Sequence, residues 1–386
     1  MFNNLKVAFA DKSDKDLNRA YLLFKTISNP LVSKTLSILT KLAIALRIPI
    51  NNIVRATIYK HFCGGTTIDN SKATIDKLWK FGIGTILDFS AEGKESEEEF
   101  NQVMKETIVS LHKAKEEKSI PFAVFKPTGL TYFRLLEKIA ANKNLSSIEK
   151  KEKNDFETRI ENICRVANLN QIPVFIDAEE SWIQDTIDNI ALKMMKKFNK
   201  NQAYIFNTLQ FYRKDRLIYL EKILEYAKKN NFFIGIKLVR GAYHEKEIKR
   251  AKEMDYACPV HKIKKDTDID YNKALKICIK NINIISICAG THNEDSSTLL
   301  ISLLKKYNIL NNDKRIYFSQ LLGMSDHISY NAAKKGFNVA KYVPYGPVKE
   351  MLPYLIRRAE ENTSISGQMG RELSNIIKEK KRRKNS

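Results

Sequence analysis

Glycine and proline are scarce in this sequence, with 14 and 9 among 386 residues. This excludes collagen-like and low-complexity classes, and the length suits one large barrel or two ordinary domains. Cysteine is scarce as well, and its five copies are odd in number and never spaced as C-x-x-C. We therefore expect reduced thiols in a cytoplasmic protein and no metal centre built on cysteines. The five cysteines are Cys63, Cys164, Cys258, Cys278 and Cys288.

Long uncharged hydrophobic runs are also missing. Residues 1–20 are polar and charged, unlike a signal peptide or a membrane span. The most apolar early stretch, residues 31–50, is interrupted by Lys34, Lys41 and Arg47. It predicts an amphipathic helix that is too charged to cross a bilayer.

Positive charge is abundant, because 66 lysines and arginines outnumber 44 acidic residues and give a net charge of +22. Such a surface attracts anionic partners. No RNA-binding signature, zinc-finger spacing or Gly-rich phosphate loop accompanies the charge, so nucleic acid is not an expected partner.

The basic excess is densest in residues 370–386, which include the run from Lys380 to Lys384. We interpret this region as a basic C-terminal tail. It is either the frayed end of a helix or a contact with anionic lipid, worth about 1 kcal/mol per basic residue near the surface. The chain is thus expected in the cytoplasm, with peripheral contact on the inner face of the cell membrane as the second interpretation.

The order of predicted elements indicates a (β/α)8 TIM-type barrel. Residues 1–80 form an N-terminal helical segment, and residues 81–369 alternate short β-branched or aromatic runs with long helical segments. A doubly wound open sheet gives a similar pattern, but the count of eight runs favours the barrel. The predicted strands span residues 83–90, 122–128, 174–178, 204–210, 234–239, 284–289, 316–322 and 339–344.

Polar or ionisable side chains end nearly every predicted strand. In a barrel the carboxyl ends of the strands meet at one mouth, where catalytic groups collect. The residues are Asp88, Glu92, Lys126, Thr128, Asp177, Glu179, Gln210, Tyr212, Lys237, Arg240, Tyr243, Thr291, His292, Asn293, Gln320 and Tyr342.

The last predicted helix carries two adjacent arginines. Helical spacing places Tyr354, Arg357, Arg358 and Glu361 on one face, opposite an apolar face. One interpretation is that the arginines face water; the other is that they hold a substrate carboxylate in a fixed fork. In the second case this helix lies over the barrel mouth.

Three kinds of chemistry fit these residues. Two carboxylates and an imidazole, from Asp177, Glu179 and His292, are enough for a metal site. Alternatively Lys126 or Lys237 forms a Schiff base, or pairs with Asp88 or Asp177. In the third interpretation the mouth holds an organic cofactor that accepts hydrogen bonds from its lysine, arginine, glutamine and histidine side chains.

Ten motifs, spread from about residue 60 to residue 362, resemble the proline dehydrogenase family in the family's order. They are Phe62-Cys-Gly-Gly65, Leu87-Asp-Phe-Ser-Ala-Glu92, Phe125-Lys-Pro-Thr128, Ile176-Asp-Ala-Glu-Glu180, Asn207-Thr-Leu-Gln-Phe-Tyr212, Lys237-Leu-Val-Arg-Gly-Ala-Tyr243, Gly290-Thr-His-Asn293, Leu321-Leu-Gly-Met324, Lys341-Tyr-Val-Pro-Tyr-Gly346 and Tyr354-Leu-Ile-Arg-Arg358 with Glu361-Asn362. The resemblance implies a monofunctional FAD-dependent barrel enzyme. It oxidises L-proline to Δ1-pyrroline-5-carboxylate, the first step of proline catabolism, and passes electrons to a membrane quinone. A hydroxyproline dehydrogenase of the same family is the alternative.

The resemblance also implies roles for single residues. By this resemblance, Arg357 and Arg358 bind the proline carboxylate, and Lys126 lies beside it. Tyr342 and Tyr354 line the proline pocket, and Tyr243 and Leu321 pack on the proline ring. Asp177 orients neighbouring polar groups, and Glu92 pairs with Arg357 over the bound ligand. The FAD-binding residues are Gln210, Lys237, Val239, Gly241, Ala242, Thr291, His292, Asn293 and Glu361. Two departures stand out: some members have Arg in place of Lys237, and some have an aromatic residue in place of His244.

Overall fold

The computed structural model describes residues 1–28, 51–89, 94–364 and 368–385, with Val32, Thr35 and Leu46 between the first two ranges. The side chains of residues 359–369 are outside this description. The helix predicted over residues 31–50, the residue Glu92 and the side chain of Glu361 therefore lie outside the described residues.

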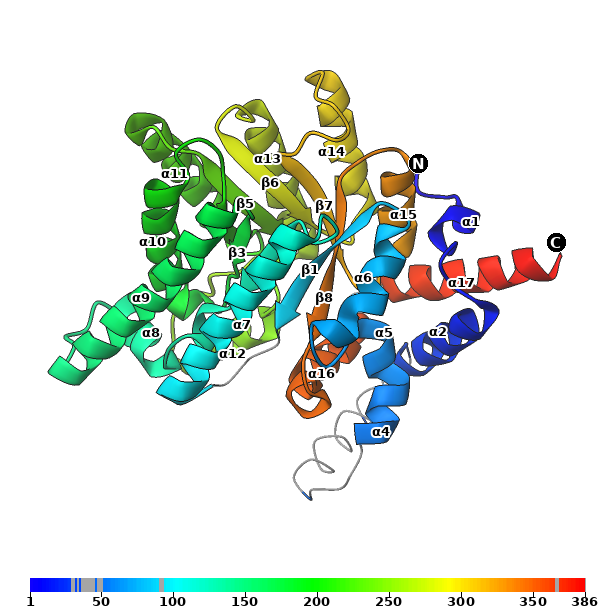
Figure 1. Cartoon of the computed structure of the whole chain (residues 1–386), viewed down its shortest axis with the longest axis horizontal. Helices are drawn as coiled ribbons and strands as arrows, with labels where there is room; N and C mark the ends of the chain where they lie inside the picture. The colour runs from blue at the N-terminus through cyan, green and yellow to red at the C-terminus, as the bar shows by residue number, and fades with distance from the viewer. Residues whose placement is uncertain are drawn as a thin grey trace. The chain divides into compact units, whose positions relative to one another are not determined.

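Eight parallel strands form a closed barrel in which each strand neighbours the next along the sequence and β1 pairs with β8 (Figure 1). This confirms the predicted (β/α)8 architecture. The strands are β1 (Ile83–Phe89), β2 (Phe122–Phe125), β3 (Val174–Ile176), β4 (Ile205–Gln210), β5 (Ile234–Val239), β6 (Ile285–Gly290), β7 (Ile316–Leu321) and β8 (Val339–Tyr345).

The strands lie close to their predicted positions because parallel strands buried on both faces are nearly continuous hydrophobic runs. Every residue of β2, β3, β4 and β8 is buried. The largest difference is at β2, which ends at Phe125 instead of residue 128. Pro127 starts a 3-10 turn there, and proline has no N–H to donate to a neighbouring strand.

The helices follow the strands as a (β/α)8 fold requires. They are α1 (Leu5–Ala8), α2 (Asp14–Ile27), α4 (Asn51–Val54), α5 (Lys60–Phe62), α6 (Lys72–Trp79), α7 (Glu97–Glu116), α8 (Phe133–Ala140), α9 (Ser147–Asn170), α10 (Ser181–Phe198), α11 (Arg216–Asn230), α12 (His244–Glu253), α13 (Lys264–Lys280), α14 (Glu294–Lys306), α15 (Asp326–Lys334), α16 (Val348–Ser364) and α17 (Gln368–Lys384). Shorter turns are the π-helical η1 (Arg55–Tyr59) and the 3-10 segments η2 (Asp69–Ser71) and η3 (Pro127–Gly129). None of the described helices is long and apolar enough to cross a membrane.

The chain divides into two compact units, which we describe separately. The first unit contains residues 1–90 and 320–386, and the second contains residues 91–319. The division at residues 80 and 369 that the sequence suggested stays a prediction.

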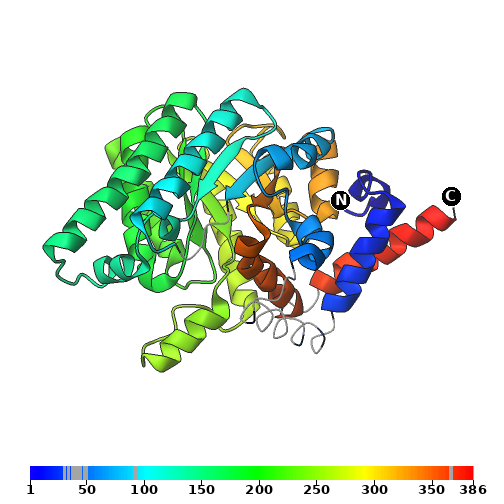
Figure 2. The same ribbon diagram turned by 60° about the horizontal axis from the view of Figure 1, so that its bottom comes forward.

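In the first unit, a hydrophobic cluster joins the N-terminal helices to the C-terminal ones. Phe24 on α2 and Phe62 on α5 share this cluster with Met351 on α16 and Ile376 on α17. Helix α17, which contains most of the predicted basic tail, lies beside α2 (Figure 2). Two of its basic side chains, Arg382 and Arg383, pair with Glu379 on the same helix. Terminal segments far apart in sequence thus form one packed layer.

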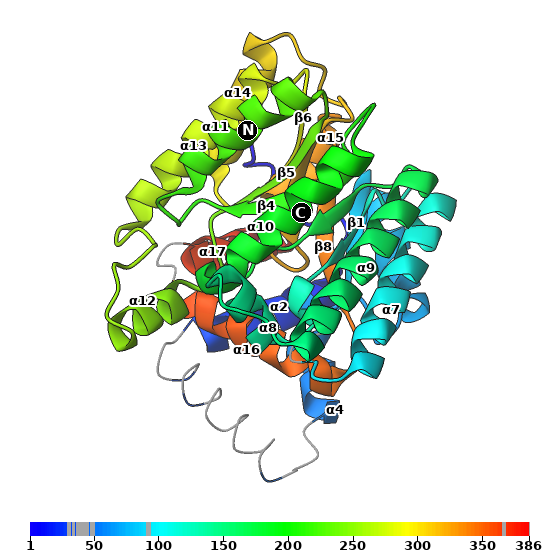
Figure 3. The same cartoon turned by 90° about the vertical axis from the view of Figure 1, so that its left-hand side faces the viewer.

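In the second unit, amphipathic helices pack around the strands and against each other. Helices α7 and α9 lie side by side (Figure 3). Ser146 begins α9 with a capping box: its hydroxyl accepts from the amide of Glu149, and the Glu149 carboxylate accepts from the amide of Ser146. The charged residues that follow Ser146 therefore belong to a capped helix.

Candidate active site

Two lysines share one buried aspartate at the strand ends of the second unit. Lys126 and Asp177 directly follow β2 and β3, and Lys237 lies within β5. The Lys126 Nζ is 3.5 Å from Asp177 Oδ2, and the Lys237 Nζ donates to Asp177 Oδ1. The Lys237 ammonium also lies 5.3 Å from the ring centroid of Phe175. The structure confirms that the barrel lysines pair with Asp177, and the group carries a net positive charge.

Glu179 braces the ends of β2 and β3. Its carboxylate accepts from the backbone N and the hydroxyl of Thr128, at 2.9 and 2.5 Å. Burial and the nearby Glu180 raise the pKa of Glu179 to about 8. The motif Asp-Ala-Glu suggested a metal-binding pair, but Asp177 holds the two lysines and Glu179 holds a turn. This bracing role was not apparent from the sequence, because it depends on contact with Thr128, 51 residues away.

Gln210 links the end of β4 to the loop after β5. Its amide donates to the backbone oxygen of Glu179 at 2.7 Å and accepts from the backbone N of Ala242 at 3.1 Å. The neighbouring Gly241 has φ +138°, and a Cβ there would approach the Tyr212 ring to 2.4 Å. Only glycine fits at this position. The loop that contains two predicted cofactor residues is therefore held in one conformation.

Arg240 connects the same loop to the end of β6. Its guanidinium donates to Asp268 at 2.7 Å, to Ser296 at 2.9 Å and to the hydroxyl of Thr291. It also lies over the Tyr271 ring, 4.4 Å from the centroid. The sequence assigned no role to Asp268, whose pKa is lowered by hydrogen bonds from Lys264 and Arg240 in spite of the opposing effect of burial.

The predicted residues after β6 form a turn that begins a helix. The hydroxyl of Thr291 accepts from the backbone N of Asn293 at 3.0 Å, and Asn293 caps α14 by accepting from the backbone N of Ser296 at 2.9 Å. His292 between them is half-buried. The free N–H groups and positive dipole of a helix N-terminus favour an anionic group nearby.

Tyr243 and Val239 complete the predicted set in this unit. Tyr243 immediately precedes α12, and its backbone oxygen accepts from the amide of Glu247 at 2.9 Å. Glu247 is fully buried and accepts from the backbone N of Ser181 at 2.7 Å, which ties α12 to the start of α10. The backbone oxygen of Val239 accepts from the amide of Phe211.

The first unit contains the remaining predicted substrate residues. Tyr342 on β8 is buried, and its backbone oxygen accepts from the amide of Leu322, next to Leu321, at 2.8 Å. On α16, Tyr354 and Arg358 are 7% and 8% exposed, and the guanidinium lies 5.1 Å from the tyrosine ring centroid. The interpretation that both arginines face water is therefore wrong for Arg358, while Arg357 is half-buried.

The comparisons with known proteins identify the family. The family model described as proline dehydrogenase matches residues 71–371. The chain belongs to the proline dehydrogenase family. The predicted site residues all lie within the matched range.

Several relatives cover most of the chain. It is 34% identical to the carbapenem antibiotics biosynthesis protein CarD of Pectobacterium carotovorum subsp. carotovorum, over 83% of each chain. It is 31% identical to mitochondrial proline dehydrogenase 1 of Dictyostelium discoideum, over 97% of this chain and 74% of the relative. It is 28% identical to hydroxyproline dehydrogenase of Xenopus laevis, over 97% of this chain and 88% of the relative.

Solved structures give the same fold. The crystal structure of proline utilization A from Bdellovibrio bacteriovorus, inactivated by N-propargylglycine, matches with a TM-score of 0.74 at 19% identity. The match covers 96% of this chain and 39% of that one, so this chain corresponds to about two fifths of the larger protein. The proline dehydrogenase fold predicted from the motifs is confirmed.

Proposed function

We propose that the chain is an FAD-dependent proline dehydrogenase that oxidises L-proline to Δ1-pyrroline-5-carboxylate and passes the electrons to a membrane quinone. The observation that carries the proposal is the group of Lys126, Asp177 and Lys237 at the strand ends, in a chain of this family. Lysines that share a buried carboxylate at the carboxyl ends of barrel strands indicate an active site better than a structural role.

The residues after β4, β5 and β6 fit FAD. Lys237, His292 and Asn293 supply donors for an anionic or heteroaromatic ligand, and the backbone at Gly241 leaves no side chain in the way. Bound FAD supplies a hydride acceptor at N5 of its flavin ring. The positive charge of Lys237 stabilises negative charge that develops on a neighbouring flavin.

Arg357 and Arg358 are proposed to bind the proline carboxylate. The buried Arg358 is held against Tyr354, which fixes the guanidinium plane and reduces the entropy lost on binding. Two guanidinium groups form bidentate bonds with a carboxylate, and these are stronger than neutral hydrogen bonds. Tyr342, Leu321 and Tyr243 are proposed to contact the proline ring.

The lysines have a second proposed role. The reaction needs the neutral amine of proline, whose lone pair stabilises the cationic character that develops as the hydride leaves. Positive charges near the substrate disfavour a protonated amine and favour the carboxylate. Asp177 offsets part of this charge and keeps both ammonium groups in place. The scheme requires no general base.

Hydroxyproline is the alternative substrate, and the match to a hydroxyproline dehydrogenase favours testing it. In the proposed pocket Tyr342 crowds a hydroxyl group at the ring's 4-position, which favours plain proline. The ratio of kcat/KM for L-proline and 4-hydroxy-L-proline decides between them. A ratio above one is expected, and a ratio below one would identify a hydroxyproline enzyme.

A product assay tests the activity. The purified protein is incubated with L-proline and a soluble short-chain quinone, and pyrroline-5-carboxylate is trapped with an aromatic amino aldehyde. We expect product that depends on quinone. Product without quinone dependence would refute the proposed acceptor, and no product from a flavin-containing protein would refute the substrate.

Peripheral contact with an anionic membrane is proposed on the basic charge alone, and it predicts sedimentation with anionic but not neutral vesicles at low salt.

A further inference from the structure

Lys341 is an unusual residue in the first unit, because its long cationic side chain is completely buried on β8. Side chains alternate between the two faces of a strand, so Lys341 and the neighbouring Tyr342 point in opposite directions. Lys341 reaches Asp326 at the start of α15, a helix outside the barrel, at 2.8 Å. Because Lys341 points outward, Tyr342 points to the interior of the barrel.

Three acceptors surround the Lys341 ammonium. They are the Asp326 carboxylate, the backbone oxygen of Leu321 at 3.3 Å and the backbone oxygen of Met324. An ammonium group has three N–H donors, so this set can use all of them. The two backbone oxygens lie at opposite ends of the turn that joins β7 to α15. One side chain thus holds both ends of this turn.

The same turn is held at two further points. Half-buried His61 lies with Nε2 2.9 Å from the backbone oxygen of Gly323; because a carbonyl only accepts, Nε2 is the protonated nitrogen. The Glu372 carboxylate accepts from the backbone N of Ser325 at 2.7 Å. Gly323 and Ser325 have φ +77° and +52°, and a turn with two left-handed residues persists only when its surroundings fix it.

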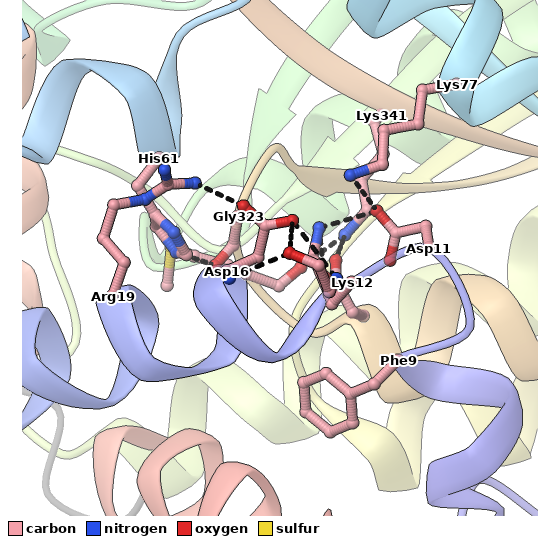
Figure 4. Close-up of polar contacts among 12 residues, drawn as sticks. Phe9, Asp11, Lys12, Asp16, Arg19, His61, Lys77, Gly323 and Lys341 are labelled. Atoms are coloured by element: carbon pink, nitrogen blue, oxygen red, sulfur yellow. Dashed lines mark hydrogen bonds and ion pairs between the residues drawn. The ribbon is translucent and has the colours of Figure 1, made fainter. Parts of the chain in front are cut away.

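Asp326 also contacts a second group of charged residues, and Figure 4 labels three of them, Asp11, Lys12 and Lys77. Lys12 is 3.3 Å from Asp326 and 2.8 Å from Asp11, and Asp11 is 3.3 Å from Lys77. These residues line a cavity of about 110 Å³ between the N-terminal helices and the turn. Burial opposes the charge of Asp326, but Lys341 and Lys12 hold its pKa well below its usual range. These pairs thus connect Lys341 through Asp326 and Lys12 to Asp11 and Lys77.

We propose that Lys341 is a positioning residue for the substrate pocket, because its bonds to the β7–α15 turn fix the places of Leu321 and Tyr342. The backbone oxygen of Leu321 accepts a hydrogen bond from Lys341, and Tyr342 directly follows Lys341 in the sequence. This inference rests on the proposed function, which assigns both residues to the proline ring. Lys341 itself touches neither substrate nor cofactor.

The test compares Lys341→Met with Lys72→Met in the full chain with flavin bound. Lys72 forms an exposed pair with Asp76 in the same unit, so its loss is a matched control. In Lys341→Met, KM for L-proline is expected to rise about tenfold while kcat stays within twofold and flavin content is unchanged. The dissociation constant of tetrahydrofuran-2-carboxylate, a ring analogue without the oxidisable amine, is expected to rise by the same factor.

An unchanged KM and an unchanged dissociation constant in folded Lys341→Met would overturn the positioning role. If this variant does not fold, the double variant Lys341→Met/Asp326→Asn also removes the buried carboxylate that has lost its nearer lysine, and the same expectations and the same refutation apply to it. If the wild-type chain is not reduced by L-proline, the proposed function fails. A wild type that is reduced, with an unchanged variant, refutes the positioning role alone.

Discussion

Each of the two units contains two lysines that share one buried aspartate, and the two groups differ in what else they hold. In the second unit, Lys126 and Lys237 pair with Asp177 at strand ends, where a barrel binds its substrate. In the first unit, Lys12 and Lys341 pair with Asp326 beside a turn. The chemical groups are the same, so their places in the fold decide their roles.

The largest expected effect distinguishes the two aspartates. In Asp177→Asn the lysines lose the charge they share and repel each other, so kcat/KM for L-proline should fall about 100-fold, equivalent to about 2.7 kcal/mol. In Asp326→Asn the amide still accepts from Lys341, and KM should rise less than about threefold. Steady-state kinetics of both variants measure this difference, and equal losses in both would contradict it.

Asp326→Asn should have its larger effect on stability. Asp326→Asn leaves the fully buried Lys341 without its carboxylate partner, while Lys12 keeps Asp11, and should lower the free energy of unfolding by about 3 kcal/mol. Urea unfolding of the flavin-bound proteins measures this. A stable Asp326→Asn variant would show that the charges behind the turn contribute little.

Arg358→Met should weaken L-proline binding by about 1.5–3 kcal/mol, the scale of a lost hydrogen bond to a charged group, and keep the flavin. L-Prolinamide, which lacks the carboxylate, is the matched ligand. The wild type should prefer L-proline over it strongly, and the variant should lose most of that preference. Normal proline binding by Arg358→Met would refute the proposed carboxylate contact.

Glu372 provides a pH-dependent test of the turn. Burial and Asp326 raise its pKa from the ordinary 4.5 to about 7. The folded state therefore favours the protonated carboxyl, and stability that is present below pH 4.5 is lost as pH rises through 7. Glu372→Gln keeps an acceptor for Ser325 and removes this loss.

Between pH 5 and pH 8 the wild type should lose about 1–3 kcal/mol more stability than Glu372→Gln. Urea unfolding at the two pH values measures the difference. Glu179, whose pKa is about 8, contributes equally to both proteins and cancels. Parallel pH profiles would show that Glu372 is charged at neutral pH.

The smallest expected effect is that of Lys72→Met. The Lys72 and Asp76 side chains are about half exposed and 2.6 Å apart. Such surface pairs contribute about 0–1 kcal/mol because water and salt screen them. Its free energy of unfolding and its kinetics should match the wild type, and a large change would mean that exposed pairs matter as much as the buried groups.

The sequence predicted the barrel well because each buried parallel strand has its own local hydrophobic pattern. Its error was local: β2 ends at Phe125, before Pro127, and not at residue 128. The pairing of both lysines with Asp177 was predicted as one of two options, since the strand ends of a barrel converge. The division of the chain, the role of Glu92 and the role of Glu361 stay predictions.

The charges around Lys341 could not be predicted in the same way. Lys341 and Lys12 are far apart in sequence, and both look like ordinary surface lysines in a basic chain. Their partner Asp326 begins a helix, where aspartate is common for local reasons. Only the tertiary structure shows that Lys341 is fully buried and bonded to the backbone of a turn. For Arg358 the sequence left exposure and burial open as alternatives, because helical spacing identifies a face and not its neighbours.

The most direct measurement is an anaerobic titration of the purified protein with L-proline, followed through its visible absorbance. We predict a yellow protein whose flavin band bleaches in proportion to the L-proline added and stays unchanged with D-proline. A folded protein without a flavin band, or with a band that L-proline leaves unchanged, would contradict the central claim.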